Sequence, residues 1–191
     1  MGAWSPAYQA QFAKPLVNQM IALIQRDQSA ALAVINAGRA ADGNQPLDPI
    51  TEFHKGPGPR TGWPWISLEV GGTTFDRSAD KTTRHHETRI LLALETGQYD
   101  QETAQEDAHD YARLLDMIIT SAGPWPALTD WTTPLPIQHS TTQTGTTAPN
   151  ASGTVSDVFV ESHVPNKVSV PGVEEPVMRI TLTVLFELEE T

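Results

Sequence analysis

The sequence predicts an α+β fold in which a mainly antiparallel four-stranded sheet packs on one long helix and on N-terminal helices. Two observations predict it. The spacing of apolar residues alternates between helical and strand periods, in the order α, α, β, β, α, β, β. The strand-like runs come in two pairs, and pairs of this kind join into one sheet whose apolar face the helices cover. At 191 residues, the chain is most simply a single domain, spanning 1–191.

The first helical region is PLVNQMIALIQRDQSAALAVINAG, residues 15–38, and its pattern predicts two pieces. Apolar residues recur at helical spacing in both, first Leu16, Met20, Leu23 and Ile24, then Ala31, Leu32, Val34 and Ile35. Gly38 is a plausible C-terminal stop. Residues 36–64 contain five prolines, at positions 46, 49, 57, 59 and 64. They are therefore expected to form a long loop.

Two strands follow. WISLEV, residues 65–70, alternates between an apolar and a mixed face, and TRHHETRILLALETG, residues 83–97, is the second strand. The polar, glycine-containing connection between them predicts a long hairpin whose tip, Asp76 to Lys81, projects from the sheet.

Residues 99–123 form the strongest helical pattern. Asp100 is a good N-cap, and Thr103 with Glu106 has the spacing of a capping box. One face is apolar, with Ala104, Ala108, Tyr111, Ala112, Leu115, Ile118 and Ile119. The opposite face is charged and is expected to be solvated or to meet a partner: it holds Glu106, Asp107, Asp110 and Arg113.

The remaining third of the chain begins with a Thr/Pro-rich arm, residues 124–154, which is expected to be a flexible excursion or to order only against a neighbour. Strands are predicted over 156–164 and 177–190. The last one alternates, with one apolar face made of Met178, Ile180, Leu182, Val184, Phe186 and Leu188, and Leu185 is the one exception on the polar face.

The net charge is −11, and from residue 90 onward 15 acids face three bases. Such a surface repels phosphate backbones and argues against sequence-specific nucleic-acid binding. The chain has no cysteine, which excludes thiol catalysis and Cys-ligated zinc. No run approaches the roughly 18–20 apolar residues of a membrane span, and the N-terminus does not read as a secretory signal. We expect a soluble product.

The stretch TRHHETRILLAL, residues 83–94, raises the question of an enzyme centre. In a strand His85 and His86 project to opposite faces, so they cannot easily bind one metal together. A small metal-dependent hydrolase would have to combine one of them with residues of the long helix, namely Asp107, His109 and Asp110. The sequence contains no H-E-x-x-H, G-x-S-x-G or phosphate-binding loop. We therefore predict no catalytic residue, no cofactor and no metal ligand.

Contacts with other chains are expected where long polar segments and loop tryptophans lie outside the core. Tryptophan is enriched at interface hot spots, although burial within the chain is its default role. The residues expected to contact a neighbouring subunit or another partner protein are Asp76, Arg77, Asp80 and Lys81 in the hairpin tip, and Trp125 and Trp131 in the arm.

The order of elements resembles a known family. A helix of the form PLVNQMIALIQ, a proline-rich loop and the strand PWISLEV precede the long strand TRHHETRILLALETG; the acid-capped helix DQETAQEDAHDYARLLDMI and the alternating strand RITLTVLFELEE follow. This looks like the tail terminator (tail completion) proteins of long-tailed bacteriophages. The resemblance covers most of the chain and is one of architecture, so no functional residue is transferred.

The resemblance implies a virion protein, made in the host cytoplasm, that forms a homo-hexameric ring at the head-proximal end of the tail tube. Such a ring ends polymerisation of the tube protein and docks the head-completion (stopper) protein, and DNA passes through its lumen without sequence-specific binding. Three alternatives stay open: another neck or tail-tube ring component, the small hydrolase, and a monomeric binding module.

Overall fold

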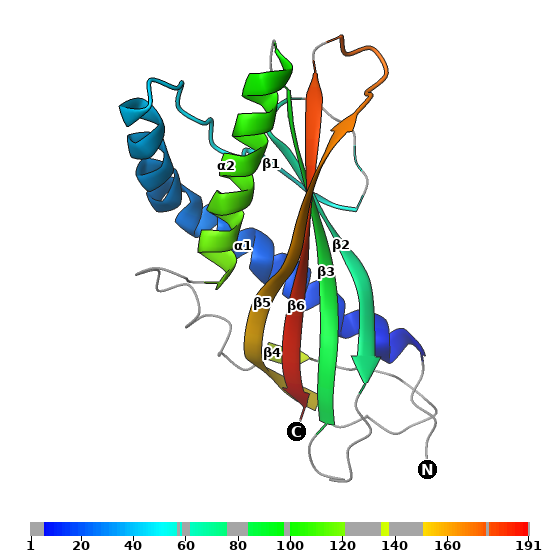
Figure 1. The fold of residues 1–191 in the computed structure, drawn as a ribbon. Helices are drawn as coiled ribbons and strands as arrows, with labels where there is room; N and C mark the ends of the chain where they lie inside the picture. Colours follow the sequence, from blue (N-terminus) through cyan, green and yellow to red (C-terminus); the bar gives the residue numbers. More distant parts are fainter. Residues whose placement is uncertain are drawn as a thin grey trace.

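Over the residues that the structure describes, the architecture is a six-stranded sheet with two helices. In a computed structural model, the chain is described over residues 6–56, 58, 62–75, 84–97, 100–120, 135–137, 151–174 and 176–190. Its elements are, in chain order, α1 (Pro6–Ala41), β1 (Glu52–Lys55), β2 (Trp65–Phe75), β3 (Arg84–Gly97), α2 (Gln101–Thr120), β4 (Leu135–Ile137), β5 (Ala151–Val168) and β6 (Val177–Glu190) (Figure 1). The predicted α+β class is confirmed.

The sheet has the strand order β1-β2-β3-β6-β5-β4. The four predicted strands form its antiparallel centre, β2-β3-β6-β5, but the expectation of only four strands was wrong. β4 adds an antiparallel edge strand, and β1 pairs with β2 in parallel, so the sheet is mixed. β1 has four residues and β4 three, which is too short for a period of two to show in the sequence.

The N-terminal region is one helix of 36 residues, where two pieces were expected. The helix passes through Gly38 and ends beyond it, at a Schellman motif. Asn44 N–H donates to the Arg39 carbonyl at 2.8 Å, and Gly43 takes the left-handed conformation, with φ of 81°, that this motif requires. The expected loop over 36–64 is correspondingly shorter, because α1 enters it at one end and β1 lies inside it.

Two strands also extend past their predicted ends. β2 continues to Phe75 through a bulge at Gly71 and Gly72, where a Cβ on Gly71 would lie 3.0 Å from the Leu91 side chain. β5 was expected to end at residue 164, yet it pairs with β6 as far as Val168. Proline is tolerated in β5, at position 165, because an edge strand leaves one side unpaired.

Helix α2 begins where the sequence predicted. Asp100 caps it, because one carboxylate oxygen accepts from Thr103 N–H and the other from the Thr103 hydroxyl, each at 2.8 Å. These bonds lower the pKa of Asp100, first through the backbone N–H and then through the hydroxyl. Thr103 therefore stands at the third helical position, and the capping box expected from Thr103 and Glu106 does not form the cap.

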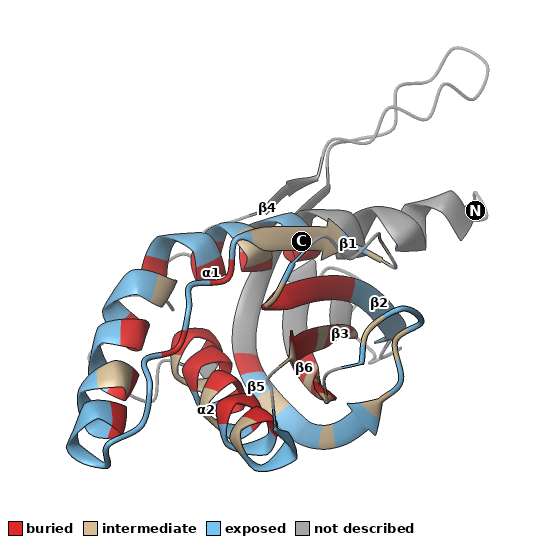
Figure 2. Cartoon of the chain, turned by 90° about the horizontal axis from the view of Figure 1, so that it is seen from above, coloured by how far each residue is buried: buried red, intermediate tan, exposed pale blue. Residues whose placement is uncertain are grey.

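The core lies between the helices and one face of the sheet, as the sequence predicted (Figure 2). The predicted stripe of α2 is buried there, from Ala104 to Ile119, together with the alternate residues Ile66, Leu68, Ile90, Leu92, Leu94, Ile180, Leu182 and Val184 of three strands. Neither described helix combines the length and apolar character needed to cross a membrane. Among the described residues no helix lies on the opposite face of the sheet, and we call that face the open face.

Candidate functional site

The six residues predicted to contact other chains lie outside the described part of the molecule: Asp76, Arg77, Asp80, Lys81, Trp125 and Trp131. Of the arm over 124–154, only β4 and the start of β5 are described. Contacts by the hairpin tip and the arm therefore stay predictions. The candidate sites that the structure does describe are a buried polar network and the open face.

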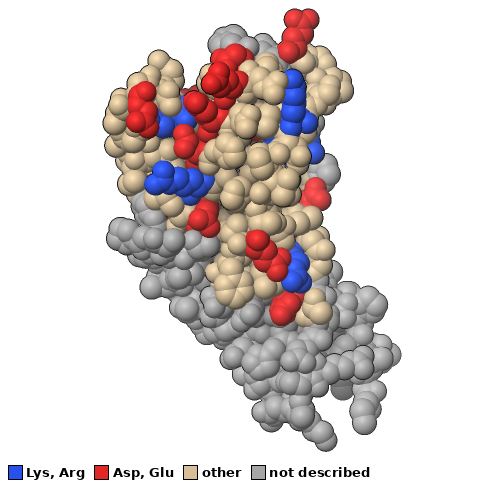
Figure 3. Space-filling view, in the orientation of Figure 1, with Lys and Arg blue, Asp and Glu red and all other residues tan. Residues whose placement is uncertain are grey.

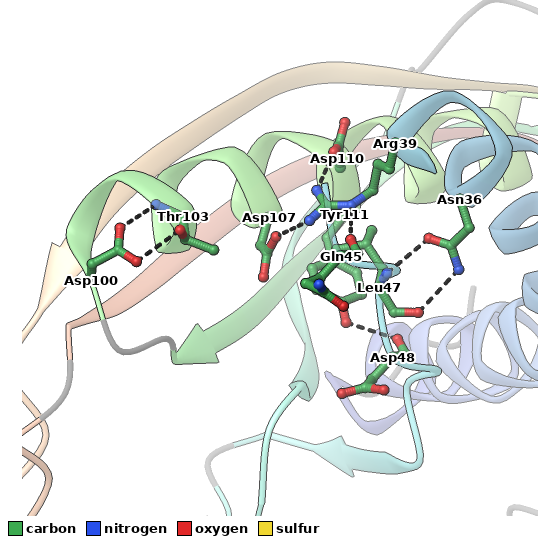
Figure 4. A network of polar contacts seen from close by, with 10 residues as sticks. All are labelled: Asn36, Arg39, Gln45, Leu47, Asp48, Asp100, Thr103, Asp107, Asp110 and Tyr111. Carbon is green, nitrogen blue, oxygen red and sulfur yellow. Dashed lines mark hydrogen bonds and ion pairs between the residues drawn. The ribbon is translucent and has the colours of Figure 1, made fainter. Parts of the chain in front are cut away.

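The polar network centres on Arg39, in the last turn of α1 (Figure 4). Its guanidinium donates to Asp107 at 2.6 Å and to Asp110 at 2.5 Å, both on α2, and to the Gln45 carbonyl at 2.6 Å. Only 5% of the Arg39 side chain is exposed. Burial lowers its pKa, but the hydrogen bonds and charges of Asp110 and Asp107 outweigh that effect and raise the pKa of Arg39 overall. Arg39 is therefore a buried cation that is paired with two carboxylates, those of Asp107 and Asp110.

Side chains of α1 also hold the segment that follows this helix through hydrogen bonds to its backbone. The Asn36 side chain donates to the Leu47 carbonyl at 3.2 Å and accepts from its N–H at 2.8 Å, and Gln28 makes the same pair of bonds with Ile50. These bonds satisfy backbone groups that no strand or helix pairs. They hold the segment against α1 without regular structure.

Tyr111 ties this segment to the second helix. Its hydroxyl donates to the Asp48 carbonyl at 2.8 Å, and burial, helped by the charges of Asp48 and Asp107, raises the pKa of the phenol far above its ordinary value. Tyr111 therefore acts as a neutral donor, and the network as a whole joins α1, α2 and the segment between α1 and β1.

This arrangement changes the expectation for the charged face of α2. Asp107 is buried rather than solvated, while Glu106, His109 and Arg113 on the same helix are exposed. Asp107 and Asp110, two members of the considered hydrolase set, are bound by Arg39. Among the described residues no group of three or more His, Asp and Glu is placed to hold a metal ion. The side chains of His85 and His86 lie outside that part.

The open face is built from cross-strand rows of β3, β6 and β5. Residues opposite one another in an antiparallel pair share a face. The rows are Ala93–Thr181–Val164, Leu91–Thr183–Ser162 and Arg89–Leu185–Phe159. They alternate with the core rows, and they combine small, β-branched and apolar side chains with Ser162 and Arg89. This composition is more typical of a contact surface than of a chemical centre.

One end of the open face is covered by the chain itself. Trp65 is buried there, with the His54 ring stacked on it at a centroid distance of 5.1 Å. Trp63 lies over Gly97, since a Cβ at that glycine would approach its indole nitrogen to 3.0 Å. Glu95 is buried beside them and pairs with Arg179. The accessible part of the face therefore begins beyond this row.

Neither feature was singled out from the sequence. Arg39 falls in the predicted loop. The signal that could have identified it was a basic residue near the end of one helix, together with two acidic residues, Asp107 and Asp110, spaced i, i+3 on another helix. The open face had a clearer signal, because three successive outward-pointing positions of β6 after Arg179 are uncharged, namely Thr181, Thr183 and Leu185.

Comparisons with known proteins give little guidance. No protein-family model and no curated protein matches the chain. A chain of the solved structure described as "Virion of native gene transfer agent (GTA) particle" is similar over 98% of this chain and 99% of its own, at 16% identity and a TM-score of 0.44. A likeness this weak does not establish a shared fold or function.

Proposed function

We propose that the chain is a structural virion protein at the head–tail junction of a long-tailed phage. It forms a ring, most simply a homo-hexamer, that caps the tail tube, ends its polymerisation and presents a docking surface for the head-completion protein. DNA passes through the lumen without being bound in a sequence-specific way. The protein works by assembly, with no reaction of its own.

The observation that carries this proposal is the arrangement of elements. The chain runs through a long helix, a pair of long strands, a second helix and a second pair of long strands. The two pairs of strands join in one sheet, and both helices lie on one face of it. This is the order on which the resemblance to tail terminators rests. The acidic charge of −11 supports it further, because a lumen that must let DNA slide should not attract phosphates.

Native mass is the first test. Light scattering on the purified chain, with negative-stain imaging of the same sample, is expected to show closed rings of about six copies, as heterologous contacts produce when their rotation closes. Open filaments or discrete two-fold dimers would contradict the ring.

Capping is tested separately. The chain is added to the tail-tube protein of the same virus while that protein polymerises. We expect shorter tubes with extra density at one end only. An unchanged length distribution, with no density at tube ends, would refute the capping role whatever the native mass.

A further inference from the structure

The segment between α1 and β1 is held by its main chain. We call residues 44–51 the strap. Six hydrogen bonds join main-chain N–H and carbonyl groups of the strap to side chains of the two helices. These side chains form what we call the strap site: Gln28, Asn36 and Arg39 on α1 and Tyr111 on α2. Figure 4 shows three of them, Asn36, Arg39 and Tyr111, reaching the strap from both helices. Recognition of a main chain in this way selects the shape of the bound segment more than its sequence.

Two side chains of the strap enter the protein interior. Leu47 and Ile50, three positions apart, are 5% and 2% exposed and belong to the hydrophobic core cluster. The remaining strap residues are exposed: Asn44, Gln45, Pro46, Asp48, Pro49 and Thr51. In peptide recognition, main-chain hydrogen bonds supply affinity and pockets for spaced side chains supply specificity. The strap therefore lies on the helices in the manner of a bound peptide.

The composition of the strap also suits a bound peptide. Pro46 and Pro49 have no N–H that would need a partner, and their fixed φ reduces the entropy lost when the segment is ordered. Asp48 is its one charged residue. In Figure 3, Asp and Glu gather over the upper part of the molecule around α2. A competing ligand is therefore expected to be uncharged or basic, with two apolar residues three positions apart.

We propose that the strap site is a peptide-binding site, occupied in this chain by its own strap. Its ligand class is an extended segment with two apolar residues three positions apart, bound through its main chain by the four side chains of the strap site. The contact is autoinhibitory, because the tethered strap competes with any free peptide at a high effective concentration. The proposal does not depend on ring formation or on capping of the tube.

The strap leaves its site by local opening. Two inserted side chains, Leu47 and Ile50, and a set of part-buried hydrogen bonds hold it in place. A region held by so few buried apolar side chains opens at a lower free energy than the strands of the core. The central strands β3 and β6 therefore stay paired while the strap is detached.

Hydrogen exchange tests this opening in the unmodified chain. The N–H groups of Leu47 and Ile50 donate to the side chains of Asn36 and Gln28, at 2.8 Å and 2.9 Å, so they exchange when the strap is detached. We expect them to exchange at least about tenfold faster than the slowest amides of β3 and β6, which report global unfolding. Exchange no faster than in those strands overturns the proposal, because the strap then leaves only when the whole chain unfolds.

Binding in trans tests the site directly. In the full-length double variant Leu47→Ser/Ile50→Ser, the tethered strap lacks its two inserted side chains. A fluorescein-labelled peptide with the sequence NQPLDPIT, that of residues 44–51, is titrated with this variant and with the native chain, and its fluorescence anisotropy is measured. We expect the double variant to bind the peptide at least about tenfold more tightly, because the native strap is the stronger competitor. A peptide with serine at both apolar positions should not bind.

A matched pair of helix variants, each added to the double variant, tests recognition of the main chain. Asn36→Ala removes two of the six bonds and is expected to weaken peptide binding about tenfold, whereas Val34→Ala, at a residue 53% exposed on the same helix, leaves it unchanged. Circular dichroism checks that each variant is folded. No binding by a folded double variant, or equal binding of both peptides, overturns the proposal. If the double variant does not fold, the exchange rates in the native chain decide alone.

Discussion

Arginine–carboxylate pairs occur on both sides of the sheet and differ in how far they are buried. On the helix side 5% of the Arg39 side chain is exposed, and it holds Asp107 and Asp110. On the open face 36% of the Arg89 side chain is exposed, and it holds Glu161 and Glu87. A buried pair is essential for stability once formed, because removing one partner leaves the other charge buried without a counter-ion. An exposed pair contributes little to stability and mainly neutralises the surface it occupies.

The largest expected effect is the loss of the buried pair. Arg39→Met leaves Asp107 buried without its arginine, and the free energy of unfolding should fall by about 3–5 kcal/mol. Denaturant unfolding at one fixed protein concentration measures it. The control is Arg113→Met, which removes the same charge from the exposed side of α2 and should change stability by less than about 0.5 kcal/mol. Equal losses in the two variants would show that net charge, not the pair, is responsible.

Neighbouring leucines of β3 sharpen the comparison between the two faces. Leu92 is fully buried under the helices, and Leu92→Ala should cost about 2–5 kcal/mol. Leu91 lies on the open face and is only half-buried, so Leu91→Ala in the single copy should cost less than about half as much. Thermal unfolding of both variants at low protein concentration tests this order. A reversed order would mean that the open face is part of the core.

The faces also differ in what the sequence reveals about them. The alternation of Ile180, Leu182 and Val184 identified the core side of β6, because burial against helices demands apolar residues at every second position. The same alternation placed Leu185 on the other side, where its burial depends on Phe159 and Arg89 from neighbouring strands. The register between strands that are distant in the sequence is not encoded locally. Which residues share a row on the open face could therefore be read only from the structure.

The Arg39 network shows the same limit more strongly. Asp107 and Asp110 read as solvated or as possible ligands, because nothing local marks a carboxylate for burial. Their partner lies about 70 residues away in the chain. The six predicted contact residues of the hairpin tip and the arm are untested for a different reason, since they lie outside the described part of the structure.

A smaller effect is expected from the exposed pair. Arg89→Gln should lower the Tm by at most about 2 °C in the single copy, and raising the salt concentration to about 1 M should shrink the difference, because exposed charges are screened. Calorimetry at both salt concentrations checks it. If the difference persists undiminished in salt, the Arg89–Glu161 pair is shielded from water and the open face is already covered.

An effect of similar size is expected at the cap of α2, where Asp100 is the N-cap residue. The lowered pKa of Asp100 means that its ionised form stabilises the fold. That contribution is complete above the ordinary pKa of an aspartate and is lost as the pH falls through the lowered value. Asp100→Ala should therefore lower the Tm by about 1–3 °C at neutral pH and by less near pH 2. Asp100→Asn, which keeps a hydrogen-bond acceptor, should retain most of the stability and lose its pH dependence. A pH-independent deficit in Asp100→Ala would mean that the cap acts through packing rather than through its charge.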